Sequence, residues 1–384
     1  MKITSRRTDT PKTRRTNPLL RITSRTTPAA ETLHFANGSP RTPAAKSLPT
    51  ALRLRSWSLR LPPRGLAAGA AVTLLGLAVS LVALSTGEFT VPIPDIVAAL
   101  FGEGPPVAEL IVSRLRAPRV VTGLLVGAAF GLSGAILQSL TRNPLGSPDF
   151  IGFTAGASTG GIAAVILGGT AWQIAGASLA GCVLSALVVY ALAYRRGVQG
   201  YRLILVGIGV GALLVSADWY MLTRADINDA ATAGAWITGS LSGRGWEHAI
   251  PVAYALAVLL PVCAWLSRPL RMMEMGDDAA RAAGIRVEPV RATAIAVAVL
   301  LCGVAVAAAG PVIFVAMAAP QLARRITRSP GVTLLTSALT GATLLVGADL
   351  AAQRVFAPVQ LPVGIMTAAI GGIYLVFLLR RERR

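Results

Sequence analysis

Lysine and histidine are scarce in this sequence, and their scarcity excludes several kinds of protein. The 384 residues contain three lysines, Lys2, Lys12 and Lys46, and none of them follows a glycine-rich phosphate loop. A P-loop requires such a lysine, so the chain holds no ATPase site of this kind. The two histidines, His34 and His248, are far apart in the sequence and indicate neither a metal site nor a proton relay.

Cysteine is as rare as lysine, with three residues. Cys182, Cys263 and Cys302 all fall inside long apolar segments, and their spacing predicts neither a disulfide framework nor a metal site. We interpret all three as packing residues. We expect this chain to bind no metal or cofactor of its own.

Charge is also scarce, since 14% of the residues are charged and 54% are hydrophobic. Long segments therefore lack Asp, Glu, Lys and Arg altogether, and about 20 apolar residues span the hydrocarbon core of a bilayer. Six of these segments have the length of a single membrane helix: 65–87, 120–141, 203–217, 249–267, 331–348 and 355–379. Each predicts one crossing.

Two further uncharged runs are too long for one crossing. The run 150–194 is interrupted at Gly168–Trp172, and the run 292–323 is interrupted at Ala309–Pro311. Each run predicts two crossings, the second pair being a full span followed by a half-length helix. The expected fold class is an all-α integral membrane protein with ten transmembrane helices.

Arginine is distributed unevenly between the loops of this arrangement. If the first 63 residues are cytoplasmic, the inner loops and the C-terminal tail hold sixteen arginines. The outer loops then hold six: Arg114, Arg116, Arg119, Arg224, Arg244 and Arg354. This asymmetry fits the positive-inside rule. We expect a multi-pass protein of the cytoplasmic membrane with both termini in the cytoplasm.

Residues 1–63 differ in composition from the predicted membrane domain, 64–384. Up to Arg64 the chain has fourteen basic residues against Asp9 and Glu31, with many Thr, Ser and Pro residues. This composition is typical of disorder, and we expect a disordered basic tail. It favours attraction to anionic lipid over nucleic-acid binding, because few aromatics are available for stacking on bases.

Glycine recurs every four residues along two of the predicted spans. The rows are Gly123, Gly127 and Gly131, and Gly152, Gly156 and Gly160. Such rows expose the helix backbone, so we expect both faces to pack closely against other helices. The same spans contain two serine-hydrolase-like patterns around Ser133 and Ser158. Neither has a strand context or an intramembrane histidine base, so a membrane enzyme is not favoured.

A transporter without a P-loop must take its energy from another source. An ion-coupled secondary transporter would need intramembrane ionisable groups or broken helices. The predicted spans offer only Asp218, close to the outer end of its helix, where an interfacial cap is the more common role. We therefore expect the driving force to come from outside this chain, and keep the ion-coupled carrier as the alternative.

A polar island, Arg268–Arg291, separates two apolar regions on the predicted cytoplasmic side. Gly276 precedes a short helix with Asp277 and Asp278 in its first turn, and Gly284 marks its end. Its alanines make it thin enough to fit a groove on another protein. An ordinary solvated loop helix is the competing interpretation.

Residues 114–157 resemble the signature of the iron–siderophore and vitamin B12 family of ABC importer permeases. Further blocks agree in order and spacing, so that the likeness extends over about 65–384: Trp236–Trp246, Met275–Val287, Ala309–Ile326 and Gln360–Arg381. The resemblance implies a type II ABC importer permease fold with ten membrane helices and two inverted repeats. It also implies a permease dimer, ABC ATPase subunits that bind ATP and Mg²⁺, and a substrate-binding protein.

The resemblance also implies roles for individual residues. The ATPase-coupling helix would comprise Gly276, Asp277, Asp278, Ala279, Arg281, Ala282 and Gly284. The outer arginines Arg116, Arg119 and Arg354 would pair with carboxylates of the substrate-binding protein, a task suited to the guanidinium group. The cytoplasmic gate loop would contain Asn143 and Pro144. The short helix at the outer mouth would contain Trp236, Gly239 and Ser240.

Several positions favour one branch of that family. The chain has Pro320-Gln321, Gln360 and Gly371-Gly372-Ile373, where the wider family commonly has Pro-His, Glu and Gly-Ala-Pro. With Asn143–Phe153, these resemble the ferric-enterobactin permeases, which pair two unlike permease subunits. The expected cargo is a ferric catecholate siderophore, and the alternative within the family is vitamin B12 or heme.

Overall fold

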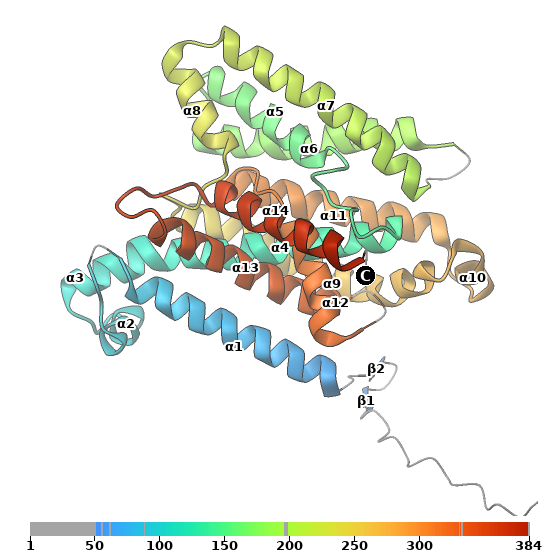
Figure 1. The fold of residues 1–384 in the computed structure, drawn as a ribbon, viewed down its shortest axis with the longest axis horizontal. Helices are drawn as coiled ribbons and strands as arrows, with labels where there is room; N and C mark the ends of the chain where they lie inside the picture. The colour runs from blue at the N-terminus through green and yellow to red at the C-terminus, as the bar shows by residue number, and fades with distance from the viewer. Residues whose placement is uncertain are drawn as a thin grey trace, which may run out of the picture. The chain divides into compact units, whose positions relative to one another are not determined.

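Helices form almost all of the regular structure in the computed structural model, which describes residues 51–54, 57–60, 63–87, 89–195, 199–329, 331 and 333–382 (Figure 1). The elements are β1 (Ala51–Leu54), β2 (Trp57–Arg60), α1 (Pro63–Ser85), α2 (Ile93–Leu100), α3 (Pro106–Glu109), the π-helix η1 (Leu110–Arg116), α4 (Ala117–Thr141), α5 (Phe153–Ile166), α6 (Ala171–Ala193), α7 (Gly200–Arg224), α8 (Ile227–Ile237), α9 (Trp246–Glu274), α10 (Asp277–Ala282), α11 (Val287–Ala309), α12 (Val315–Thr327), α13 (Leu334–Arg354) and α14 (Val363–Glu382).

Every segment predicted to cross the membrane contains a helix. In the described part of the chain, seven are long and apolar enough to span a bilayer: Arg64–Ser85, Pro106–Thr141, Ala171–Ala193, Gly200–Arg224, Trp246–Glu274, Val287–Ala309 and Leu334–Arg354. The shorter helices are α5 with 14 residues, α12 with 13, and the apolar stretch Val363–Tyr374 of α14. The membrane class is confirmed, and the count of ten crossings stays a prediction.

Both predicted interruptions of the long runs are confirmed. Between α5 and α6, Thr170 begins the new helix through a capping box in which its backbone N–H donates to the side chain of Gln173 at 2.7 Å. Between α11 and α12 the break follows Ala309, because Pro311 cannot continue the hydrogen-bond ladder of a helix. The half-length helix expected there is α12.

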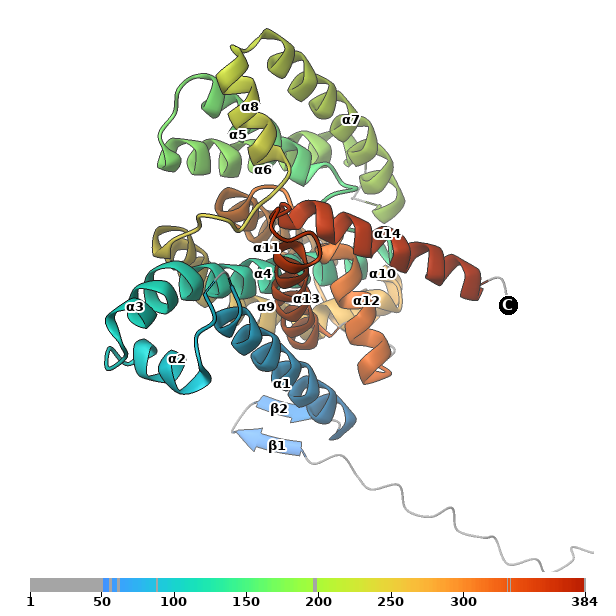
Figure 2. The ribbon, with the colours of Figure 1, turned by 60° about the vertical axis from the view of Figure 1, so that its left-hand side comes forward.

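The centre of the bundle is α4, which packs against α9, α11, α12 and α13 (Figure 2). Most of its residues are buried, and its glycine face meets α13. A Cβ placed on Gly127 would overlap the carbonyl oxygen of Gly341 and lie 2.8 Å from the Cα of Ala342. Backbone therefore meets backbone along this seam, as the glycine spacing predicted.

The second glycine row joins α5 to α6. A Cβ on Gly160 would overlap the carbonyl oxygen of Ala177, and one on Gly156 would lie 2.6 Å from that of Gly181. The helices α5 to α8 contact one another, and α5 and α6 also pack on α11 (Figure 1). Cys182 lies in that contact, buried, with its thiol 3.5 Å from the carbonyl oxygen of Val299.

The predicted tail, 1–63, lies largely outside the described residues. Within it, the strands Ala51–Leu54 and Trp57–Arg60 pair antiparallel, Ala51 with Arg60 and Leu54 with Trp57. The disorder of the tail as a whole stays a prediction. Leu52 and Leu54 in one strand, and Trp57 and Leu59 in the other, alternate with polar or small residues, which is the period-two pattern of a strand.

Candidate functional site

The short helix expected in the polar island is α10, six residues long. Gly276 precedes it with φ +121° and Gly284 follows it with φ +82°, both in the region that favours glycine. Ala280 is fully buried and fixes the helix against the bundle. On the opposite side, the Asp278 side chain is entirely exposed and that of Arg281 is 53% exposed. This exposed face is available to a partner.

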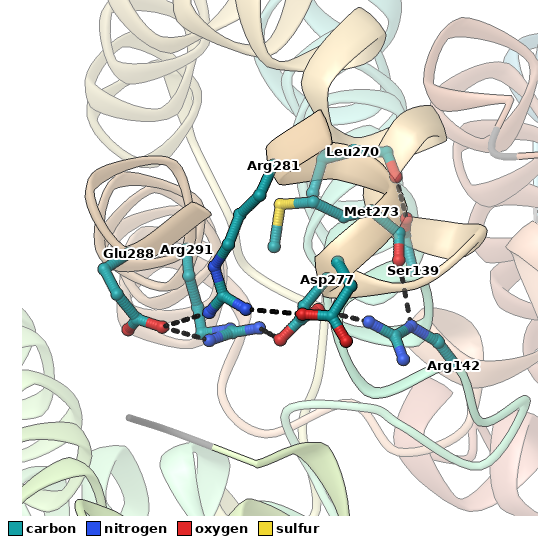
Figure 3. Close-up of polar contacts among 9 residues, drawn as sticks. Ser139, Arg142, Leu270, Met273, Asp277, Arg281, Glu288 and Arg291 are labelled. Carbon is teal, nitrogen blue, oxygen red and sulfur yellow. Dashed lines mark hydrogen bonds and ion pairs between the residues drawn. The ribbon is translucent and has the colours of Figure 1, made fainter. Parts of the chain in front are cut away.

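Asp277, the first residue of α10, lies between two arginines and bridges them (Figure 3). Its Oδ1 pairs with Nη2 of Arg142, at the C-terminal end of α4, and its Oδ2 lies 2.6 Å from Nη2 of Arg291, in the first turns of α11. Arg291 also donates to Glu288 at 2.8 Å. One carboxylate thus connects α4, α10 and α11.

The charge state of Asp277 follows from these contacts. Burial alone would raise its pKa, but hydrogen bonds and the positive charges of Arg291 and Arg142 outweigh burial and hold the pKa below its usual value. A carboxyl whose pKa is lower in the folded state stabilises the fold above its unfolded pKa, and this stabilisation disappears only as pH falls through the folded value. Asp277 is therefore an anion near neutral pH.

The predicted gate residues, Asn143 and Pro144, follow α4 directly. The Asn143 side chain accepts a hydrogen bond from the Leu145 N–H at 2.9 Å, which shapes the turn. Gln321 of α12 donates to the carbonyl oxygen of Pro144 at 2.8 Å. The structure thus places the loop between α4 and α12, where a pocket is lined by Gln138, Arg142, Asn143, Pro144, Glu274 and Arg324.

The predicted outer-mouth residues lie at and after the end of α8. Gly239 has φ +65°, and a Cβ there would overlap the carbonyl oxygen of Pro311. Ser240 donates its N–H to the carbonyl oxygen of Ala309 at 2.8 Å. A Cβ on Gly161 would overlap the Trp236 ring. The segment therefore covers the break between α11 and α12. There it supplies hydrogen-bond partners to backbone groups that have none within a helix, because the helix is interrupted.

The three outer arginines differ in availability. Arg119 forms a bidentate pair with Asp349 of α13, both N–O distances being 2.8 Å, and its side chain is 16% exposed. Arg116 donates to the carbonyl oxygen of Leu84 at 2.7 Å and also to that of Phe89. Arg354 is exposed. Of the three, Arg354 presents its guanidinium most openly to a partner.

Two expectations about charged groups in the spans are wrong. Asp218 is not an interfacial cap, because it is buried within α7 and accepts a hydrogen bond from Thr159 of α5 at 2.5 Å. It is also not the only ionisable group in the spans, because α13 contains Asp349 with 4% of its surface exposed. The sequence analysis defined each span as a run without charged residues, so the predicted span 331–348 ended directly before Asp349.

Two more polar residues prove to be packing groups. Ser133, part of a hydrolase-like pattern, donates to the carbonyl oxygen of Ala298 at 2.7 Å and so joins α4 to α11. His248 contacts Arg244 at 3.0 Å and Glu247 at 3.2 Å in the first turn of α9. In the sequence, Arg142 and Arg291 indicated only which loops are cytoplasmic. Arg142 directly follows a predicted span and Arg291 ends the polar island, and these positions were the available indication that both could contact the short helix.

Comparisons with known proteins agree with this arrangement. A model of the FecCD transport family matches residues 74–381. The ferric enterobactin transport system permease protein FepG of Escherichia coli is 45% identical over 302 residues, which cover 78% of this chain and 92% of that protein. The achromobactin transport system permease protein CbrC of Dickeya dadantii is 37% identical, over 81% of this chain and 90% of its own length.

The fold has a counterpart among solved structures. A metal-chelate type ABC transporter in an inward-facing conformation superposes with a TM-score of 0.72 over 82% of this chain and 99% of the other. Sequence identity is 24%, so this match concerns the fold alone.

Proposed function

Because this chain belongs to the FecCD transport family, we propose that it is the permease subunit of an ABC importer that carries a ferric siderophore of the catecholate type across the cytoplasmic membrane. The observation that carries the proposal is the 45% identity with the ferric enterobactin permease over 92% of that protein. The membrane helices and the exposed face of α10 support it.

The proposed assembly follows the type II importers. This chain would cross the membrane ten times with both termini in the cytoplasm, contain two inverted repeats, and pair with a related but unlike permease subunit. ATP and Mg²⁺ would bind only to partner ATPase subunits. A substrate-binding protein would deliver the cargo to the outer face, where α8 and the segment up to Ser240 border the entrance.

The side chains of α10 have different proposed contacts, because some are exposed and one is paired within the permease. The exposed Asp278 and Arg281 would contact the ATPase, whereas Asp277 is bound to the permease itself. Closure of the ATPases on ATP would move α10, and closely packed glycine faces would let helices slide between two arrangements without large side-chain barriers.

Transport by reconstituted protein tests the proposal. We expect proteoliposomes that contain this chain, its sibling permease and the ATPase to import ferric enterobactin, with a binding protein outside and ATP inside. An uncoupler should not change the rate, because no ion gradient is used. Import without ATP, or import abolished by the uncoupler, would establish the ion-coupled carrier instead.

A second prediction concerns docking at the outer face. Replacing the exposed Arg354 by Glu should weaken binding of the substrate-binding protein about tenfold and make the remaining affinity less sensitive to salt, because a peripheral charge acts mainly on association. The measurement is a titration of the complex in nanodiscs at two ionic strengths. Arg224→Glu is the control, since Arg224 stacks on the Tyr220 ring and has no proposed docking role. Equal effects of both variants would refute docking at Arg354.

A further inference from the structure

Arg142 occupies an unusual position between a helix and a loop. It is the C-cap of α4, with φ +50°, and the next two residues are the gate residues Asn143 and Pro144. A residue with a side chain rarely adopts this left-handed conformation unless its surroundings hold it there. Here the backbone N–H of Arg142 donates to Ser139 at 3.3 Å, and that of Asn143 donates to Gln138 at 3.3 Å. The start of the loop is thereby fixed to α4.

The side chain of Arg142 extends away from this loop to α9 and α10. Its Nε donates to the carbonyl oxygen of Met273 at 2.9 Å, and its Nη2 pairs with Asp277 (Figure 3). Met273 is in the last turn of α9, and Asp277 begins α10. The guanidinium therefore bridges the joint at Gly276, and α10 cannot turn about that joint without moving Arg142 or breaking these contacts.

The other contact of Asp277 leads to a different part of the fold. Arg291 is only 7% exposed and is held by Glu288, so this branch ends within the first turns of α11. The Arg142 branch ends on a loop. Of the two branches, only the one through Arg142 reaches the residues predicted to open and close the passage.

The gate loop at Asn143 and Pro144 is also attached to α12, and a pocket lies beside it. Gln321 holds the carbonyl oxygen of Pro144, and Gln138 donates to the carbonyl oxygen of Met317 at 2.9 Å while accepting from Arg324 at 3.0 Å. These contacts join the loop and the end of α4 to α12. The polar pocket described above lies between them. A displacement of Arg142 can thus shift the loop against α12.

We propose that Arg142 is the positioning residue through which a movement of α10 is transmitted to the gate loop. The inference deepens the proposed function and rests on it, because α10 moves only if an ATPase drives it. Arg281 would receive the force from the partner, Asp277 would pass it inward, and Arg142 would carry it across the joint at Gly276 to Asn143.

The first measurement follows the loop and needs no cargo. Spin labels at Leu145→Cys and Leu335→Cys, both exposed, report the distance between the loop and α13, since the native cysteines are buried. In the assembled transporter we expect this distance to change on addition of ATP, and Arg142→Gln to abolish the change. A loop that stays still in the unsubstituted protein, or that still moves in Arg142→Gln, would overturn the proposal.

Arg328→Gln is a matched control. Arg328 is also an exposed arginine at a helix C-cap with φ +50°, at the end of α12, and no hydrogen bond of its side chain is present in the described part of the chain. Loop movement should be unchanged in this variant. Arg142→Lys keeps the charge opposite Asp277 and should restore part of the movement. An unchanged thermal midpoint of Arg142→Gln separates transmission from misfolding.

Import supplies the second readout. Arg142→Gln should keep ATP hydrolysis within about twofold of the unsubstituted protein, while ferric enterobactin imported per ATP falls about tenfold, within the usual range of coupling between sites. A parallel fall in hydrolysis and import would assign Arg142 to assembly and refute transmission. If the unsubstituted protein moves its loop with ATP but imports no ferric enterobactin, the assigned cargo fails and the role of Arg142 stands.

Discussion

Replacing Gly127 by leucine should remove most of the folded protein from the membrane. Gly127 and Gly341 meet face to face between α4 and α13, and a Cβ on either residue would overlap the carbonyl oxygen of the other. Ordinary overpacking costs about 1 to 3 kcal/mol. The cost at Gly127 should be at the upper end or above, because the obstructing atoms are backbone and have no rotamer to which they can move.

Folding at Gly127 can be measured as the amount of monodisperse protein extracted from membranes and as its thermal midpoint. Gly176→Leu is the matched control, since Gly176 lies in the spanning helix α6 and a Cβ there would meet nothing within 4 Å. Gly127→Ala should give an intermediate loss. If Gly127→Leu unfolds at the same temperature as Gly176→Leu, the close seam between α4 and α13 is not needed for stability.

The glycine rows show how much of this fold the sequence predicts. Spacing of four residues defines a helix face, and small residues on it permit close approach, so Gly127 and Gly160 were placed correctly in contacts. The partner helices were not predictable. Nothing in the sequence around Gly127 indicates Gly341, more than two hundred residues away, because tertiary contacts depend on the arrangement of all helices.

Span boundaries were predicted less well, for a physical reason. Charged residues can lie inside a membrane helix when another residue of the bundle pairs with them, and an uncharged segment therefore ends before its helix does. The predicted span 120–141 begins after Arg119, yet the helical stretch extends back to Pro106. Asp349 lies just outside the predicted span 331–348 and within α13.

The candidate site was predicted as a set of residues but not as a set of contacts. The short helix and its two glycines were predicted from local signals, and α10 has these limits. Asp277 and Asp278 look alike in the sequence, whereas the Asp277 side chain is 29% exposed and pairs with two arginines of neighbouring helices, and the Asp278 side chain is fully exposed. The direction of a side chain on a six-residue helix depends on where Ala280 packs, and that is a tertiary property.

Asp349→Ala should destabilise the protein as severely as Arg119→Ala. Each side chain satisfies the other through two hydrogen bonds of 2.8 Å, with 16% of Arg119 and 5% of Asp349 exposed. Removing one partner of a buried ion pair leaves the other charge uncompensated and costs about 3 to 5 kcal/mol. We expect the lower end of this range, because Arg119 retains some access to water. The measurement is the thermal midpoint in detergent, with the exposed Asp226→Ala as the control.

The double variant decides what Arg119 does. If the ion pair serves only to hold α4 against α13, the double variant Arg119→Ala/Asp349→Ala should be no less stable than either single variant. In the double variant neither charge remains without its partner. Both single variants should then weaken docking of the substrate-binding protein to the same extent. If Arg119 instead binds a carboxylate of that protein, Asp349→Ala frees the guanidinium, and affinity should rise while Arg119→Ala lowers it. The affinity for the substrate-binding protein should therefore fall in Asp349→Ala if the ion pair only stabilises the permease, and rise if Arg119 contacts the binding protein.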